Sequence, residues 1–219
     1  FWLAECELLN YHEAFDLTYG WEGMRAFDKY FKDELKFDEI RSILINYSHY
    51  PIGSRKLLFT SNHDENTYYG TEYEKYGVCA KAMAVFTCTW PGIPLIYSGQ
   101  EKPNLKRLEF FEKDFIDWEG EVELHGFYKT LLTIRKKNKA LQESASVLLL
   151  RTDQPEVLLY LCRRQHDKVL VLMNLSKQAA TFRIDHPALA GQYVDLFSGE
   201  PKTMNRKETF NFQAGEYLV

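Results

Sequence analysis

Carboxylate, imidazole and amide side chains follow short apolar runs in this sequence. Glu5 closes the run FWLAE, and Glu7 comes two residues later. The stretch FTSNHDEN places Asn62, His63 and Asp64 directly after a second apolar run. Carboxyl groups that are brought together repel one another and lose hydration, which raises the pKa of at least one of them. A carboxyl group that keeps its proton near neutral pH is what general acid catalysis requires.

Each of these acidic residues also has a structural interpretation. A carboxylate that follows a strand often caps the first turn of the next helix, where the helix dipole favours negative charge. For Glu7, Glu65 and Glu101 the capping and the catalytic interpretations both stay open. For Glu5 the catalytic interpretation is favoured, because this residue still lies within its apolar run. A lone histidine at a strand end is more often structural, but His63 stands between an asparagine and an aspartate.

The elements that would position these side chains alternate along residues 1–143. Apolar runs predict strands at residues 1–5, 14–19, 55–61 and 91–99. Between them, apolar residues recur at helical spacing, for example at Met24, Phe27 and Phe31. This repeated strand–helix order predicts a parallel sheet with helices packed outside it. Because the carboxyl ends of parallel strands share one edge, the polar clusters that follow the strands are expected to converge there.

Two later segments predict further helices. Residues 73–90 are rich in small apolar side chains, which predicts one largely buried helix. Residues 123–141 predict a helix that closes the strand–helix series. Its inward face is expected to carry Leu124, Phe127, Tyr128, Leu131 and Leu132.

The pattern changes after about residue 145. Strand-like runs such as EVLLYLCRR and KVLVLMNL are separated by turn segments such as DQPE and SGEPK. Six or seven strands at this spacing predict an antiparallel sandwich. The predicted domains are therefore an α/β unit at residues 1–143 and an all-β antiparallel sandwich at residues 144–219.

The segments at the strand ends resemble, in order, the signature segments of the α-amylase family, glycoside hydrolase family 13. FWLAE is similar to the family's fifth-strand segment, whose glutamate is the general acid/base, and this maps onto Glu5. FTSNHDEN is similar to the seventh-strand segment, which maps onto Asn62, His63 and Asp64. PGIPLIYSGQE resembles the eighth strand, and FFEKDFIDW resembles the segment before the last barrel helix. The resemblance implies a partial (β/α)8, or TIM-type, barrel with strands 5 to 8, followed by the sandwich.

The resemblance implies a retaining glycoside hydrolase that acts on α-1,4-glucan, such as starch and maltooligosaccharides. Glu5 would protonate the leaving oxygen and then activate water, while Asp64 would stabilise the transition state. His63 would donate a hydrogen bond to a hydroxyl of the same sugar. Two alternatives stay open: an α-glucan transglycosidase or a sucrose- or trehalose-converting member, and a non-catalytic carbohydrate-binding relative.

Aromatic residues beside these segments could stack on sugar faces. The candidates are Trp2, Tyr68 and Tyr69. Each has a structural alternative, which is the barrel core for Trp2 and a surface loop for the two tyrosines.

The resemblance covers four of the eight strand–helix units of a full barrel. The family's nucleophilic aspartate belongs to the fourth strand, and no matching segment is present, so we expect the 219 residues alone to be inactive. The chain begins inside a strand without an initiator Met, which predicts a longer natural protein with any targeting segment upstream. An open half-barrel would expose strand edges and apolar surface, which predicts self-association.

Composition sets further expectations about partners and cofactors. The net charge is −4 with no concentrated basic cluster, which argues against nucleic acid, and no apolar stretch is long enough to span a bilayer. Four scattered cysteines show no metal-ligand spacing and are expected to be buried free thiols. They are Cys6, Cys79, Cys88 and Cys162. We expect no cofactor in this chain. The resemblance implies calcium in a full-length protein and favours a location outside the cytoplasm, since starch-degrading relatives are often exported.

Overall fold

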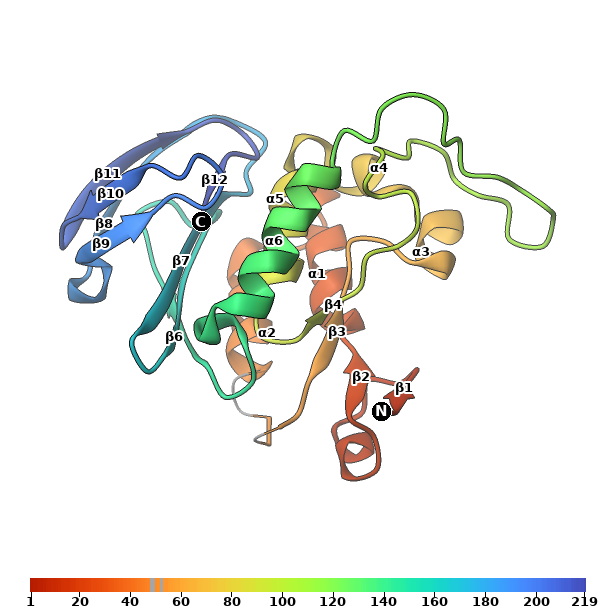
Figure 1. Ribbon diagram of the computed structural model, residues 1–219, viewed down its shortest axis with the longest axis horizontal. Coiled ribbons are helices and arrows are strands. Elements are labelled where there is room, and N and C mark those ends of the chain that lie inside the picture. Colours follow the sequence, from red (N-terminus) through yellow and green to blue (C-terminus); the bar gives the residue numbers. More distant parts are fainter. Residues whose placement is uncertain (48–49, 52) are drawn as a thin grey trace.

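The computed structural model describes residues 1–47, 50–51 and 53–219. Figure 1 shows an α/β region, coloured red to green, beside an antiparallel region coloured blue. Helix α6 (His125–Lys137) runs between the two. We call residues 1–141 the half-barrel and residues 146–219 the β region. This order of a parallel β/α region followed by an antiparallel region is the predicted fold class.

The half-barrel contains a parallel sheet. Within the described residues its strands are β1 (Leu3–Ala4), β2 (Leu17–Tyr19), β3 (Lys56–Leu58) and β4 (Ile93–Pro94), hydrogen-bonded in that order. All three pairings are parallel, so the carboxyl ends of the strands lie at one edge. The ladders are shorter than the predicted strands at residues 1–5, 14–19, 55–61 and 91–99.

Helices and 3-10 turns surround this sheet. They are η1 (Leu9–Glu13), α1 (Trp21–Phe31), α2 (Phe37–Tyr47), α3 (His63–Tyr68), α4 (Glu72–Tyr76), η2 (Gly77–Cys79), α5 (Ala80–Thr89), α6 and η3 (Lys139–Leu141). The prediction that every strand is followed by a helix was wrong for the first unit, because only η1 joins β1 to β2. The predicted single helix at residues 73–90 is interrupted where Gly77 adopts a positive φ of 53°.

The inward face predicted for the last helix of the half-barrel needs one correction. Leu124, Tyr128 and Leu131 are buried as predicted. Leu132 is 41% exposed, so its prediction as a core residue was wrong. The physical reason is that α6 covers the half-barrel with one narrow stripe, and Leu132 lies beside that stripe.

The β region consists of antiparallel strands. They are β5 (Ser146–Leu150), β6 (Val157–Arg164), β7 (Asp167–Asn174), β8 (Ala180–Asp185), β9 (Gly191–Val194), β10 (Pro201–Met204), β11 (Lys207–Phe212) and β12 (Tyr217–Leu218), with the 3-10 turn η4 (Pro187–Leu189) between β8 and β9. Among the described residues, one sheet has the order β12-β7-β6-β5, and β8 pairs with β11 while β9 pairs with β10. Residues 198–202 were predicted as a turn, but β10 begins at Pro201. Proline is tolerated at a strand's first residue.

A shared hydrophobic core joins the half-barrel to the β region. Trp90, at the end of α5, packs its ring 4.9 Å from the ring of Tyr160 on β6. The Thr89 and Tyr160 hydroxyls also share a hydrogen bond of 2.5 Å. A second core lies inside the β region, where Phe182 stacks on Phe210. The domain boundary at residues 143/144 stays a prediction, since this continuous packing crosses it.

The cysteines and the helices bear on two expectations from composition. All four cysteines have free thiols, and Cys79, Cys88 and Cys162 are buried as predicted. Cys6 is only half-buried, so the prediction of burial was wrong for this residue. Within the described part of the chain, none of the helices combines the length and the apolar character needed to cross a bilayer.

Candidate active site

The polar stretch after β3 forms the start of helix α3. The side-chain oxygen of Asn62 accepts hydrogen bonds from the backbone N–H groups of Asp64 (3.0 Å) and Glu65 (2.8 Å). This N-cap fixes His63 and Asp64 in the first helical turn, where the helix dipole favours the carboxylate. Asn62 is buried and its oxygen is already engaged, so its geometry favours positioning its neighbours over touching a sugar itself.

His63 and Asp64 lie together at the surface. The Nε2 atom of His63 lies 3.6 Å from the Oδ1 atom of Asp64. The side chain of His63 is 62% exposed and that of Asp64 is 36% exposed. Both groups are therefore accessible to a ligand, which suits side chains that would bind a substrate.

Glu5 lies at the same edge of the sheet as His63 and Asp64. Glu5 directly follows β1, and the N–H of Tyr19, at the end of β2, donates to the carbonyl of Cys6 at 3.0 Å. Burial raises the pKa of Tyr19, and the negative charges of Glu5 and Asp64 raise it further. Glu5 follows β1 and Asp64 lies in the helix that follows β3, so the two residues come after the strands that flank β2 and Tyr19.

The aromatic candidates are all at the surface. Trp2 is 71% exposed, so it does not lie in the core of this half-barrel. Tyr68 and Tyr69 are exposed at the end of α3. The Tyr68 ring lies 5.0 Å from that of Phe110, and the guanidinium of Arg25 lies 5.7 Å from the ring of Tyr69.

The segment between β4 and α6 is attached to α3. The N–H of Leu108 donates to the Asn66 side chain at 2.7 Å, and the Thr67 hydroxyl donates to the Leu108 carbonyl at 2.5 Å. Arg107 pairs with Glu74 at 3.0 Å. Farther along, Figure 1 shows the yellow-green segment reaching away from the sheet. These contacts hold residues 107–108 of the segment against α3 and α4.

A buried polar cluster, which the sequence did not predict, lies after the end of β3. The carboxylate of Glu72 is 4% exposed and accepts hydrogen bonds from the Thr60 hydroxyl (2.7 Å) and the Gln100 amide (2.6 Å). The same amide also donates to Thr60 and to the Tyr128 hydroxyl. Burial raises the pKa of Glu72, although these hydrogen bonds oppose the change. We call Thr60, Glu72, Gln100 and Tyr128 the Glu72 cluster; it fixes the end of β3 to α4, to the β4–α6 segment and to α6.

The three acidic residues with open interpretations all have structural partners. The Oε1 atom of Glu7 accepts from the N–H of Glu22 at 2.6 Å, which caps the first turn of α1. Glu101 accepts from the N–H of Gly99 at 3.1 Å. Glu65 lies 3.9 Å from the buried ammonium of Lys75.

The Glu65–Lys75 pair shows the cost of burying charge. Burial raises the pKa of Glu65 and lowers the pKa of Lys75, although each charge favours the other's ionised form. Desolvation therefore outweighs the attraction between the two groups.

In the described residues no cluster of three or more His, Cys, Asp or Glu side chains could hold a metal ion. Calcium in a longer protein stays a prediction.

Comparison with known proteins gives concordant matches. A family described as "Maltogenic Amylase, C-terminal domain" matches residues 147–218. The chain is 25% identical over 165 residues to "Alpha-amylase 2" of Dictyoglomus thermophilum, covering 70% of this chain and 27% of that protein. It is 31% identical over 157 residues to "Alpha-amylase MalA" of Haloarcula japonica, covering 69% of this chain and 22% of that protein.

Solved structures show the same fold. A noncanonic maltogenic α-amylase, AmyB from Thermotoga neapolitana, superposes with a TM-score of 0.85 at 22% identity, over 100% of this chain and 53% of that chain. An α-amylase from Lactobacillus plantarum gives a TM-score of 0.77 at 19% identity, over 97% of this chain and 49% of that chain. The chain therefore spans about a quarter of these curated relatives and about half of these solved structures.

Proposed function

The chain is related to the C-terminal region of α-amylase-family proteins, and from this premise we propose that it carries half of the catalytic centre of a retaining glycoside hydrolase for α-1,4-glucan. Glu5 is the general acid/base, and Asp64 stabilises the transition state. The observation that supports this most directly is the position of both residues at the carboxyl ends of parallel strands: Glu5 follows β1 and Asp64 follows β3, on either side of Tyr19 at the end of β2. Accessible carboxylates at one edge of a parallel sheet are the arrangement that such chemistry needs.

In the proposed mechanism, Glu5 protonates the glycosidic oxygen as the bond to the anomeric carbon breaks. As that bond breaks, a nucleophilic carboxylate on another strand, about 5–5.5 Å from Glu5, bonds to the anomeric carbon and gives the covalent glycosyl intermediate. Glu5 next removes a proton from a water that attacks the same carbon, which breaks the bond to the nucleophile and releases its carboxylate. Asp64 faces the positive charge that develops on the sugar, and His63 donates to a hydroxyl of that ring.

The names of the relatives favour maltooligosaccharides as the substrate class. They include a maltogenic α-amylase and a cyclomaltodextrinase that is 27% identical over 123 residues. Solved relatives include an α-amylase complexed with acarbose and AmyP E221Q in complex with maltotriose. The same residues serve hydrolysis and transglycosylation, because the acceptor can be water or a sugar.

The isolated 219 residues should not hydrolyse α-glucan, because they contain no candidate for the nucleophile. We expect no new reducing ends when the purified chain is incubated with maltoheptaose. Turnover comparable to that of whole amylases, in a preparation free of longer enzyme, would contradict this part of the proposal.

The acid/base assignment can be tested in a protein that contains these residues together with the remaining strands. Glu5→Gln should abolish cleavage of substrates with poor leaving groups, whereas activated substrates with added azide should be partly turned over. Glu7→Gln is the matched control, because an amide oxygen still accepts from the N–H of Glu22. If Glu5→Gln behaves like Glu7→Gln, the assignment of Glu5 is wrong.

We also propose that the isolated chain associates with itself through the half-barrel. Strands β1 and β4 are the edges of the parallel sheet, and Phe1, Trp2 and Leu3 at the β1 edge are exposed. Unpaired edges and exposed apolar side chains both promote association. Sedimentation should show dimers or larger species that dissociate in the Leu3→Lys variant. A monomer at every concentration would contradict this.

A further inference from the structure

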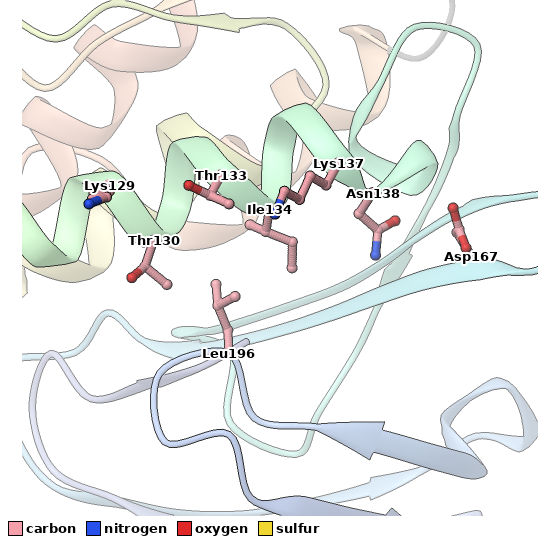
Figure 2. Close-up of a pocket in the computed structure, with 8 residues that line it drawn as sticks. All are labelled: Lys129, Thr130, Thr133, Ile134, Lys137, Asn138, Asp167 and Leu196. Carbon is pink, nitrogen blue, oxygen red and sulfur yellow. The ribbon is translucent and has the colours of Figure 1, made fainter.

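Two opposite charges are buried where α3 meets α4. The side chains of Glu65 on α3 and Lys75 on α4 are only 10% and 3% exposed. The lysines in Figure 2 instead reach water: Lys129 and Lys137 are exposed on α6, where they line the hollow between this helix and the β region. Glutamate and lysine are rarely buried unless they are paired. The geometry of the pair therefore decides whether its burial is favourable.

The Glu65–Lys75 pair has poor geometry for buried charges. The Oε2 atom of Glu65 and the Nζ atom of Lys75 are 3.9 Å apart, which is too far for a hydrogen bond. Two buried charges offset their lost hydration only when good hydrogen bonds accompany the attraction between them. Burial accordingly raises the pKa of Glu65 and lowers the pKa of Lys75. The surroundings thus disfavour the ionised form of each group.

The other charges around Glu65 do not remove this cost. On α1, the guanidinium of Arg25 favours the ionised form of Glu65, but it belongs to an exposed residue. The negative charges of Asp28 on α1 and of Asp64 on α3 oppose ionisation and add to the rise in the pKa of Glu65 that burial causes. Lys75 is therefore the buried cation on which the carboxylate of Glu65 depends.

The surroundings of Lys75 are also mixed. The carboxylates of Asp28 and Glu72 favour its ammonium form, while the charge of Lys32 on α1 opposes it. Lys32 binds the Oδ2 atom of Asp28 at 2.7 Å, and the Oδ1 atom is buried without a hydrogen-bond partner among the described residues. The ring of Tyr76 lies 5.2 Å from the Lys75 ammonium, and burial raises the pKa of this phenol, so it stays neutral.

The backbone of Glu65 connects both ends of α3. At the start of the helix its N–H donates to the side chain of Asn62 at 2.8 Å. At the end its carbonyl accepts from the N–H groups of Tyr69 (2.9 Å) and Gly70 (3.1 Å). A displacement of the Glu65 side chain is therefore expected to move the whole of this short helix, including the first turn with its candidate site residues.

We propose that the Glu65–Lys75 pair weakens the attachment of α3 to α4 while both members are charged, and so allows α3 to move relative to the strand ends. Glu65 and Lys75 are positioning residues in this inference, because neither buried side chain is accessible to a substrate. The consequence for sugar binding rests on the proposed function: the attached form of α3 is the one in which His63 and Asp64 hold the sugar.

Neutralising the pair should tighten the attachment of α3. Replacing a buried ion pair by neutral side chains of similar volume is often neutral or stabilising, and here desolvation outweighs the attraction. Protonation of Glu65 acts in the same direction. Its raised pKa gives stability that is present below pH 4.5 and is lost as the pH rises through the higher value. Helix α3 should thus be held more firmly in mild acid than at neutral pH.

The test follows amide hydrogen exchange in the 219-residue chain, at the Tyr69 and Gly70 N–H groups that donate to Glu65. The double variant Glu65→Gln, Lys75→Met should slow this exchange roughly tenfold near neutral pH, compared with wild type at the same pH. The slowing should be smaller at about pH 5, which is closer to the pKa of Glu65 in wild type.

The double variant Asp33→Asn, Lys177→Met is the matched control. It removes an exposed ion pair and should leave the exchange in α3 unchanged. If Glu65→Gln, Lys75→Met fails to fold, or exchanges as fast as wild type, the inference is overturned. Equal slowing at both pH values, or equal slowing of the amides in β6 and β7, would overturn it as well, because the effect would then be a general gain in stability.

Maltoheptaose separates this inference from the proposed function. If His63 and Asp64 hold the sugar, it should produce amide NMR shifts near α3 and slow the exchange of the same amides in wild type, since a ligand stabilises the form that binds it. Slowing by the double variant without any effect of the sugar would support the inference and count against sugar binding at the candidate active site. Slowing by the sugar alone would support the proposed function and overturn the inference.

Discussion

Arg41 and His63 show how differently two regions of this molecule hold polar side chains. Arg41 is 3% exposed between the half-barrel and the β region, and it donates to the carbonyls of Leu150 (3.0 Å) and Val157 (2.6 Å). His63, at the carboxyl ends of the parallel strands, is largely exposed and lies beside the carboxylate of its neighbour Asp64. A group whose hydrogen bonds are all made inside the protein cannot bind a substrate. The contrast therefore separates polar groups that support the fold from those available for chemistry.

Other side chains follow the pattern of Arg41. Within the half-barrel, Arg135 on α6 donates to the carbonyls of Cys88 (2.9 Å), Trp90 (3.3 Å) and Gly92. The next contact crosses the junction. The Tyr30 hydroxyl on α1 donates to the Leu175 carbonyl at 3.1 Å. Each side chain satisfies backbone groups that burial would otherwise leave without partners. The junction is thus held by polar contacts as well as by the shared core.

The largest effect on stability is expected for Arg41→Ala. This substitution leaves the Leu150 and Val157 carbonyls buried without their donor, and hydrogen bonds to a charged group are the strong ones. We expect a loss of roughly 3 to 4 kcal/mol in the free energy of unfolding, measured by urea denaturation.

Arg151→Ala is the control for this substitution. Arg151 is exposed, and we expect a change within about 0.5 kcal/mol. If the two variants were equally stable, the contrast between the junction and the candidate site would lose its energetic basis.

Gly215→Ala tests the same junction through the backbone. Gly215 has a φ of 73°, and an added Cβ would lie 2.3 Å from the carbonyl oxygen of Val78. Gly199 has a φ of 75° but open space around the position of a Cβ. Both alanine variants carry the backbone cost of about 1–2 kcal/mol, and Gly215→Ala should lose about 2 kcal/mol more through the clash. Equal melting temperatures of the Gly215→Ala and Gly199→Ala variants would show that the backbone at the junction moves aside at little cost in free energy.

The sequence predicts a helix correctly where apolar residues recur at helical spacing and so form one buried face. Met24, Phe27 and Phe31 are buried on α1 because residues three and four apart share one side of a helix. Helix α3 was missed, since the polar stretch was interpreted as a strand end. Asn62 followed three residues later by Glu65 resembles an N-terminal capping pattern and could have revealed it.

The candidate site was predictable only in part. Residue types and their place after apolar runs singled out Glu5, His63 and Asp64, and the position of Tyr19 between two of them needed the structure. The Glu72 cluster had no local signal, because its hydrogen bonds join residues 12 and 28 positions apart in the chain. Contacts of this kind depend on how strands and helices pack, which a single sequence does not encode in any short pattern.

Glu72→Gln tests whether a buried polar group near the candidate site contributes to stability as the buried groups at the junction do. Burial raises the pKa of Glu72 above its ordinary value of 4.5. A raised pKa gives stability that is present below pH 4.5 and lost as the pH rises through the higher value. Wild type should therefore lose stability relative to the variant over that range, by less than the effect of Arg41→Ala. Urea unfolding at several pH values measures the difference, and the other buried carboxylates cancel because both proteins contain them. Parallel pH profiles of wild type and variant would mean that the pKa of Glu72 is the same in the folded and the unfolded state.

The smallest effect on stability is expected for His63→Ala. The histidine is at the surface, and its contact with Asp64 is an exposed pair of the kind that contributes little. The free energy of unfolding should change by no more than about 0.5 kcal/mol. At the same time, the NMR shifts that maltoheptaose produces near α3 should disappear, because the side chain is proposed to donate to a sugar hydroxyl. A strongly destabilised variant that still binds the sugar would place His63 with Arg41, among the residues that hold the fold, and would remove the distinction between the two regions.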